Sequence, residues 1–415
     1  MAATNASTSP TPMISKNKPV DWLFIFKFNA ADFPECKGNR PDPGIFGGKQ
    51  KDYKGRYSLQ YVYASSDNPK LKKGNNCLGN SLSDPLGATF AQIYFGDYYY
   101  VLWNDQFYGK PIDTKGGPWG HSKGAIAWND QGEGMVLQVS TPSWPGSGNE
   151  KYPRPGKKNA KGKIVGTDEN TLGTMKDDDI EVSQHFFATK LNKSDVIKVL
   201  KGLQNASVVT NTSKPSIVNN GGPADIQAIV KTLGKKSPSK ECTLVKLSNG
   251  MQFISKPYHY AVPPWQLVSA KLGGIPLRVA SWWASPEIYS TVKGEHISCW
   301  NSNLGIPGAV EIATSGTWGK QSLGLKGGTG KNYNHAKLGV STNPKKPLCI
   351  FGDMNQQGAL NPNSDYIGQQ CTSSQNGRGG TFYVMQDETL FASMTDLLKG
   401  ESAPTVGPPP RPKRK

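Results

Sequence analysis

Two short stretches decide the fold: Gly120-His121-Ser122-Lys123-Gly124 and Asn334-His335-Ala336-Lys337. Each contains the tripeptide His-x-Lys, and the chain has only five histidines, so the repetition needs an explanation. Side chains at positions i and i+2 of a strand point to the same face, which sets each imidazole beside an ammonium group. One such motif in each half of the chain predicts a single site that is built from two similar halves.

The pairing of histidine with lysine suits chemistry on a phosphate ester. An imidazole can attack phosphorus or transfer protons, while a lysine holds the non-bridging oxygens. Either motif alone is more often an ordinary polar histidine than a catalytic one. The presence of two motifs, each followed by an apolar strand, reverses that judgement.

Composition narrows the classes of partner. The 415 residues include 48 Lys+Arg against 31 Asp+Glu, a formal net charge of +17. This charge favours nucleic acid or an acidic membrane surface, although many basic proteins bind neither. No stretch approaches the ~20 apolar residues of a membrane span. The N-terminus lacks the apolar core of a secretory leader, which leaves open a cytosolic or mature form or another route of export.

Cysteine spacing argues against a structural metal. The six cysteines are widely scattered and none forms Cys-x-x-Cys, so a zinc site is not expected. Disulfides and buried free thiols both stay open. The acidic run at residues 177–179 has no supporting ligand set and is interpreted as solvated charge, so no metal and no cofactor is expected.

Hydrophobic periodicity predicts an α+β chain. Strands are expected over residues 21–28, 57–64, 92–104 (one or two strands), 124–128, 135–141, 277–283, 296–300, 336–340 and 348–351. Helices are expected over residues 194–204, 223–233 and 389–398. The predicted organisation is a disordered N-terminus (1–18), an N-terminal half (19–204), a linker (205–222), a C-terminal half (223–400) and a disordered basic tail (401–415).

The two halves also match beyond their histidines. In each half an apolar strand follows the motif and ends in small polar residues. Ser140 lies 17 positions after Lys123, and Asn355 lies 18 positions after Lys337. Hydroxyl and amide groups at these strand ends are suited to donate hydrogen bonds to phosphate oxygens.

Seven segments, in order, resemble those of the deoxyribonuclease II family, which has the phospholipase D-like fold. They cover roughly residues 20–400 and are Val20-Asp21-Trp22 with Phe26-Lys27, Trp103-Asn104-Asp105-Gln106, the first His-x-Lys motif, Ser140-Thr141-Pro142, the second motif, Gly352-Asp353-Met354-Asn355, and Arg378-Gly379-Gly380. The aspartate that follows the lysine by five positions in phospholipase D motifs is replaced by Trp128 and Thr342, which fits the deoxyribonuclease branch. Asn334, Leu338 and Gln356 depart from the animal enzymes.

The resemblance implies a fold and a mechanism. Two similar halves of αβα sandwich type would be related by a pseudo-twofold, and each would contribute one motif. His335 would be the nucleophile that forms a phosphohistidine, and His121 would protonate the leaving oxygen and then activate water. Lys123 and Lys337 would hold the phosphate oxygens. The supporting residues would be Ser140, Asn355, Asn104, Gln106 and Asp353.

The family further implies metal-independent endonucleolytic cleavage of double- or single-stranded DNA, with 3′-phosphate ends. A site that needs one charged and one neutral histidine is expected to work best in acid. The active unit would be a monomer with an internal pseudo-dimer, or a homodimer. Two alternatives remain: a phospholipase D-like phosphodiesterase that acts on lipids or other diesters, and a non-catalytic DNA-binding relative. Asn104-Asp105-Gln106 and Arg378-Gly379-Gly380 have a plain interpretation as backbone turns. No role is assigned to His185, His259 or His296.

Overall fold

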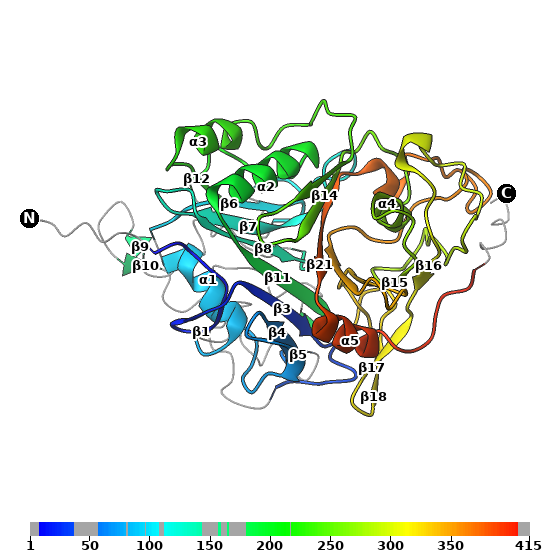
Figure 1. The fold of residues 1–415 in the computed structure, drawn as a ribbon, viewed down its shortest axis with the longest axis horizontal. Coiled ribbons are helices and arrows are strands. Elements are labelled where there is room, and N and C mark those ends of the chain that lie inside the picture. Colours follow the sequence, from blue (N-terminus) through cyan, green and yellow to red (C-terminus); the bar gives the residue numbers. More distant parts are fainter. Residues whose placement is uncertain are drawn as a thin grey trace, which may run out of the picture.

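The computed structural model describes residues 8–36, 57–79, 82–95, 97–107, 112–142, 157–158, 164–165, 180–215 and 217–405. Over these ranges the chain forms a mixed α+β structure with two large sheets, three small two-stranded sheets and five α-helices (Figure 1). The expected α+β class is therefore correct. Most of the predicted basic tail and of the polar stretch at residues 150–179 lies outside the described residues.

The first large sheet has eight strands in the order β12-β6-β7-β8-β11-β3-β4-β5, and all its neighbouring strands are antiparallel. Its strands are β3 (Trp22–Lys27), β4 (Tyr61–Ser65), β5 (Asn68–Lys73), β6 (Tyr99–Asn104), β7 (Lys123–Trp128), β8 (Gly134–Val139), β11 (Gln184–Leu191) and β12 (Val218–Asn219). Every residue of β3, β7 and β8 is buried. Both faces of this sheet centre are therefore covered, which explains why these strands are apolar runs rather than alternating sequences.

The second large sheet has seven strands in the order β13-β14-β21-β20-β19-β15-β16. Its strands are β13 (Thr243–Lys246), β14 (Gln252–Lys256), β15 (Leu277–Ala280), β16 (Val310–Ile312), β19 (Leu338–Ser341), β20 (Leu348–Gly352) and β21 (Gly380–Gln386). Only the edge pair β15–β16 is parallel. The two motifs occupy matching positions in the two sheets. The lysine of the first motif is the first residue of β7, and the lysine of the second motif immediately precedes β19.

The two large sheets share a core at the centre of the molecule, where β11 and β21 appear in Figure 1. Phe187 of β11 stacks on Phe351 of β20, with ring centroids 4.1 Å apart. Phe24 of β3 also contacts Phe351, at 4.9 Å, and Tyr383 of β21 lies 5.6 Å from Phe187. Aromatic packing therefore fixes the position of one sheet against the other.

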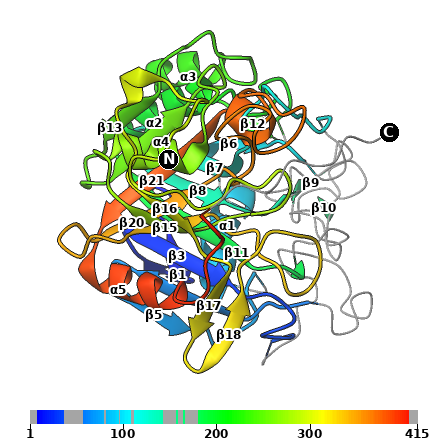
Figure 2. The same ribbon diagram turned by 90° about the vertical axis from the view of Figure 1, so that its right-hand side faces the viewer.

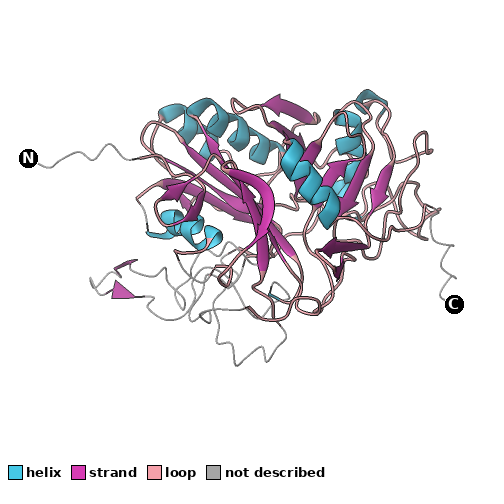
Figure 3. Cartoon of the chain, turned by 60° about the horizontal axis from the view of Figure 1, so that its bottom comes forward, coloured by secondary structure: helices cyan, strands magenta, loops and turns pink. Residues whose placement is uncertain are grey.

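Helices lie around the strands (Figure 3). They are α1 (Pro85–Phe95), α2 (Lys193–Asn205), α3 (Ala224–Val230), α4 (Pro264–Lys271) and α5 (Glu388–Leu397). Helix α2 follows β11 and packs on β8, β11 and β14, while α5 follows β21 and packs on β20 and β5. Each of these two helices thus covers a seam between the sheets. Asn192 and Asp387 cap them through side-chain oxygens that accept backbone N–H groups.

The smaller elements lie at the periphery. They are the ribbon β1 (Met13–Ser15) with β2 (Lys18–Pro19), the pair β9 (Lys157–Lys158) with β10 (Ile164–Val165), the hairpin β17 (Ser315–Trp318) with β18 (Gln321–Gly324), and the 3-10 turns Ser302–Leu304 and Ser374–Gly377. The β17–β18 hairpin extends from the lower edge of the molecule (Figures 1 and 2). None of these elements carries a predicted site residue.

Several predicted elements differ from the structure. Residues 92–95 belong to helix α1 and not to a strand, because this helix is apolar around most of its circumference and shows little helical periodicity. Residues 8–18, expected to be disordered, include β1, and the Gln92 side chain of α1 bonds to both backbone groups of Thr11. The expected linker at residues 205–222 includes β12 and buries Val208, Val209 and Ile217. The exact division into halves stays a prediction.

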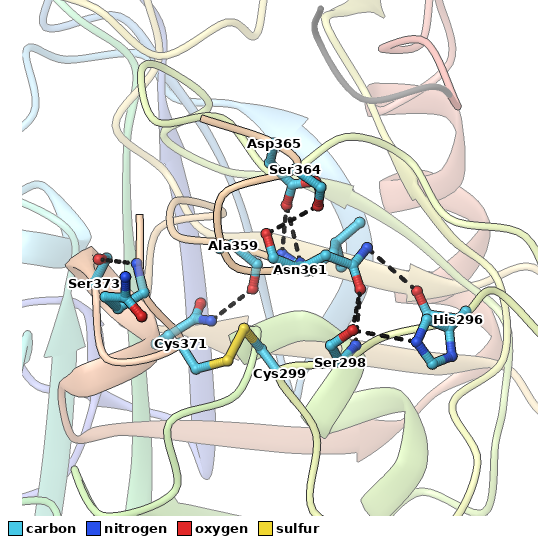
Figure 4. Close-up of a disulfide and its surroundings, with 12 residues drawn as sticks. His296, Ser298, Cys299, Ala359, Asn361, Ser364, Asp365, Cys371 and Ser373 are labelled. Carbon is cyan, nitrogen blue, oxygen red and sulfur yellow. Dashed lines mark hydrogen bonds between the residues drawn. A yellow bond between two sulfur atoms is a disulfide. The ribbon is translucent and has the colours of Figure 1, made fainter. Parts of the chain in front are cut away.

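Both outcomes that the cysteine count left open occur. Cys36 is bonded to Cys77 and Cys299 to Cys371, whereas Cys242 and Cys349 are buried free thiols. Around the Cys299–Cys371 disulfide, Asn361 accepts hydrogen bonds from Ser298 (Figure 4). This bonded loop is irregular, so the strand predicted at residues 296–300 is wrong.

Candidate active site

The first motif lies where β7 begins, and its histidine is held by the second sheet. The backbone N–H of His121 donates to Gly379 O at 2.8 Å, and its Nδ1 lies 2.8 Å from Asp353 O. Gly379 immediately precedes β21, and Asp353 immediately follows β20. A carbonyl oxygen can only accept, so Nδ1 carries the proton and Nε2 of the neutral ring has the lone pair.

The second motif shows the reciprocal arrangement. The backbone N–H of His335 donates to Ser183 O at 2.7 Å, and its Nδ1 lies 3.2 Å from Ser140 O. Ser183 immediately precedes β11, and Ser140 immediately follows β8. Each histidine is therefore oriented by backbone carbonyls at the same two strand positions in the opposite sheet, and its Nε2 is left with the lone pair.

The two motifs influence each other electrostatically. Burial lowers the pKa of both histidines well below 6.5, and Lys123 and Lys337 each lower both pKa values further by like-charge repulsion. His121 also acts on His335. His121 is 7% exposed and His335 is 8% exposed, whereas Lys123 and Lys337 are 2% and 0% exposed. All four residues of the two motifs' histidine and lysine pairs are therefore buried.

The two lysines have different partners. Lys337 Nζ donates to the carbonyl of His335 at 2.6 Å. Lys123 Nζ forms a buried ion pair with Asp105 Oδ1, also at 2.6 Å. The other carboxylate oxygen of Asp105 accepts from Arg378 Nη2 at 2.8 Å. Burial alone would raise the pKa of Asp105, but Lys123 and Arg378 hold it well below its usual range.

Ser140 supports the site through its backbone rather than its hydroxyl. Its Oγ donates to Gln184 Oε1 at 2.6 Å and accepts from the backbone N–H of His185 at 2.8 Å. The hydroxyl is thus engaged within the protein, and the carbonyl is the group that orients His335. The predicted hydrogen bond from this hydroxyl to phosphate stays a prediction.

The other predicted supporting residues differ in their contacts. Asn355 donates from Nδ2 to Gln357 Oε1 at 2.8 Å, and its buried Oδ1 has no partner among the described residues. Asn104 accepts the backbone N–H of Gln106 at 2.8 Å and so closes a turn at the end of β6. Gln106 is exposed. Asn104 therefore shapes the turn, in line with its plain interpretation.

Asp353 joins both parts of the site. Its backbone carbonyl orients His121, and its carboxylate accepts from Ser122 Oγ at 2.6 Å and from the hydroxyl of Thr381. Burial raises the pKa of this carboxyl to about 6, although these hydrogen bonds work in the opposite direction. Asp353 is therefore a carboxyl group that becomes neutral in mildly acidic solution.

Sequence reasoning missed four further side chains at the site. Asp105 lies between the two predicted residues of its segment, and its partner Arg378 was interpreted only as part of a turn. His185, which received no role, is fully buried, and its Nδ1 accepts the backbone N–H of Lys337 at 3.1 Å. Trp282 packs edge to face on His335, with ring centroids 4.3 Å apart. The Asp105–Arg378, His185–Lys337 and Trp282–His335 contacts each join segments over 50 residues apart in the chain. The sequence around each of these residues therefore gives no signal of its contact.

The described residues contain neither a metal-ligand cluster nor a membrane-spanning helix. Among the described residues, no group of three or more His, Cys, Asp or Glu side chains is placed to hold a metal ion. The acidic run at residues 177–179 lies outside them. Within the same part of the chain, no helix has the length and apolar character needed to cross a membrane.

Comparison with known proteins decides the family. The family model described as Deoxyribonuclease II matches residues 12–399, which is nearly the whole chain. The chain belongs to the deoxyribonuclease II family. The resemblance of its seven segments is thereby confirmed, and the protein is a deoxyribonuclease, a hydrolase that acts on phosphodiester bonds.

Among solved structures, this deoxyribonuclease II family member matches a crystal structure of a mutant yeast tyrosyl-DNA phosphodiesterase. The identity is 10% and the TM-score is 0.32, and the match covers 72% of this chain and 87% of that chain. No match was found among curated proteins.

Proposed function

We propose that this protein is a metal-independent acid endonuclease that hydrolyses DNA through a phosphohistidine on His335 and leaves 3′-phosphate ends. The observation that carries the proposal is the reciprocal hold on the two histidines. Each imidazole donates from Nδ1 to a carbonyl of the opposite half, so each Nε2 is directed to the reaction. One such nitrogen serves as nucleophile and the other as acid and base.

A pseudo-twofold between the halves is part of this proposal, and buried lysines supply independent support. Lys27 ends β3, and its ammonium group bonds to the carbonyls of Ile180 and Val182, four and two residues before β11. Lys256 ends β14 and bonds to the carbonyls of Asn376 and Arg378, four and two residues before β21. Matching interactions at matching strand positions are expected if the two halves share one plan.

The proposed reaction has two displacements. In the first, His335 Nε2 attacks phosphorus, the P–N bond forms, the bond from phosphorus to the 5′ oxygen breaks, and protonated His121 gives its proton to that oxygen. In the second, neutral His121 takes a proton from water, the water oxygen attacks phosphorus and the P–N bond breaks. The released strand carries a 3′-phosphate, and both histidines return to their starting states.

The lysines supply the positive charge that the transition state needs. Lys123 and Lys337 flank the two histidines, and their ammonium groups act on both imidazoles. Fixed charges in a site shielded from water stabilise a developing phosphorane more strongly than they would in solution. One chain contains both motifs, so a monomer is sufficient for one complete site.

Cleavage of supercoiled plasmid in acid with EDTA tests the proposal. The wild-type protein should nick the plasmid, whereas His335→Ala should not. His259→Ala is the matched control, because this exposed histidine contacts the Ser239 carbonyl and the Tyr258 ring and no residue of the site. A neutral optimum with a requirement for Mg²⁺ would overturn the mechanism. Hydrolysis of phosphatidylcholine without plasmid cleavage would favour the lipid alternative.

A further inference from the structure

The positions that follow β6 and β15 differ in charge. These strands lie next to β7 and β19, the strands that the two motifs lead into. The residue after β6 is Asp105, which is 2% exposed. The residue after β15 is Ser281, whose neutral hydroxyl donates to Met354 O at 3.2 Å. One half therefore places a buried carboxylate beside its motif where the other half has a hydroxyl.

The Asp105 carboxylate is held rigidly. Lys123 bonds to one of its oxygens at 2.6 Å and Arg378 to the other at 2.8 Å. The same guanidinium donates from Nε to Trp119 O at 2.9 Å and from Nη2 to Gly120 O at 3.1 Å. Arg378 thereby fixes the chain that leads into His121, and it comes from the segment that precedes β21 in the opposite half.

We propose that Asp105 is the positioning residue that assigns the two histidines their different roles, because its buried charge favours the protonated form of His121 and leaves His335 neutral. This inference rests on the proposed function. It adds the reason why His121 is the acid and His335 the nucleophile, although their backbone hydrogen bonds are alike.

The pKa values of both histidines are lowered, and among the groups that act on His121 is one carboxylate, Asp105, that works in the raising direction. Burial, Lys123, Arg378 and Lys337 lower the pKa of His121, and Asp105 acts in the raising direction. For His335, burial, Lys337, Lys123 and His121 lower the pKa, and the hydrogen bond to the Ser140 carbonyl raises it. Within the part of the chain that the structure describes, the charged or titratable groups that face His121 are Lys123, Asp105, Arg378, Lys337, Asp353 and His335. Asp353 becomes neutral in acid, so Asp105 remains the anion at the working pH.

A change of leaving group separates this role from a purely structural one. An oligonucleotide with sulfur in place of the bridging 5′ oxygen releases a thiolate, which needs no proton from an acid. Asp105→Asn should cleave ordinary DNA about 100-fold more slowly than wild type, yet cleave the sulfur-containing strand within about threefold of the wild-type rate. Its activity on ordinary DNA should also fall off at a lower pH, because the pKa of His121 drops without the nearby anion.

Controls keep the inference distinct from the proposed function. Asp195→Asn removes another fully buried carboxylate, paired with Lys198 on α2, and should leave cleavage of both substrates unchanged. His121→Ala should be rescued by the sulfur substrate, and failure of that rescue would refute the proposed acid. The role of Asp105 alone is refuted if the sulfur substrate rescues His121→Ala but Asp105→Asn cleaves both substrates equally slowly. It is also refuted if Asp105→Asn cleaves both substrates at the wild-type rate.

A second pair of variants covers the case in which Asp105→Asn does not fold. Arg378→Gln removes a positive charge that lowers the pKa of His121, so the decline of activity at high pH should move upward. Arg378→Lys keeps the charge and should leave the decline near its wild-type position. Identical pH profiles for the two variants would overturn the inference, because a structural clamp alone predicts no difference between them.

Discussion

The surroundings of His121 and His335 agree in their backbone and differ in their charges. Both imidazoles are oriented by carbonyls that follow β8 or β20, and both backbone N–H groups bond to the residue before β11 or β21. The lysine of the first motif forms an ion pair with a buried carboxylate, that of Asp105. The comparison teaches that a repeated backbone can position two equivalent groups, while a single charged side chain makes their chemistry unequal.

The largest expected effect comes from removal of either histidine. His335→Ala should lower the cleavage rate by about 10⁴-fold or more, because it removes the proposed nucleophile. His121→Ala should lower it by about 10²–10⁴-fold, the usual contribution of general acid–base catalysis. Single-turnover rates on a labelled duplex measure both losses. Equal rates for His335→Ala and wild type would remove the distinction between the two histidines.

The pH dependence should show which protonation state limits the reaction. The pKa of each histidine is lowered, so the neutral form is favoured and the acid His121 gains its proton only below the ordinary value of about 6.5. The cleavage rate should therefore decline as pH rises, by about tenfold per unit on the alkaline limb. Rates from pH 4 to 8 in EDTA test this, and a rate that increases toward neutral pH would contradict it.

The buried ion pair makes the two lysines unequal in stability as well as in chemistry. Lys123→Met leaves the Asp105 carboxylate with only Arg378, which should cost about 3 kcal/mol of unfolding free energy. The double variant Lys123→Met/Asp105→Asn should recover part of this loss. Urea unfolding measures both, with Lys193→Met as a control for a half-exposed pair, that of Lys193 with Asp225, worth about 0–1 kcal/mol. If Lys123→Met lost as little unfolding free energy as the control variant, the buried ion pair would not be needed for stability.

Sequence predicted more of the strands than of the site. The apolar runs at β3, β7, β8 and β20 were recognised because burial on both faces leaves long hydrophobic stretches. The two motifs and the strand-end residues Ser140 and Asn355 were also identified from spacing, whereas Asp353 was identified from the family resemblance. How these groups bond was not, because a carbonyl contact such as that of His335 with Ser140 depends on the backbone and carries no residue signature.

Asp353 should affect stability in a pH-dependent way. Its carboxyl pKa is raised from 3.8 to about 6, so the carboxyl stabilises the fold fully below pH 3.8, and that stability is lost as pH rises through about 6. Asp353→Asn removes this cost and should raise the unfolding free energy by about 2–3 kcal/mol at pH 8. No gain is expected at pH 4. Denaturation at both pH values is the measurement, and a gain of the same size at pH 4 would contradict the assignment.

Ser140→Ala should have the smallest effect. The hydroxyl bonds to Gln184 and His185, whereas the carbonyl that orients His335 is kept in the variant. A loss of about 1 kcal/mol of stability and a change of only a few-fold in cleavage rate are expected. Thermal unfolding and steady-state cleavage check this. A loss near that of His121→Ala would show that the hydroxyl itself contacts the phosphate.

The central claim is that two similarly held histidines perform unlike steps, and its most direct test is to map the covalent intermediate. The protein would be mixed with labelled DNA in acid with EDTA, quenched in alkali to preserve phosphohistidine, digested and analysed by mass spectrometry. The account predicts the DNA-linked phosphate on the peptide that contains His335, and its loss in His335→Asn. Phosphate on His121, or on neither histidine while cleavage proceeds, would contradict it.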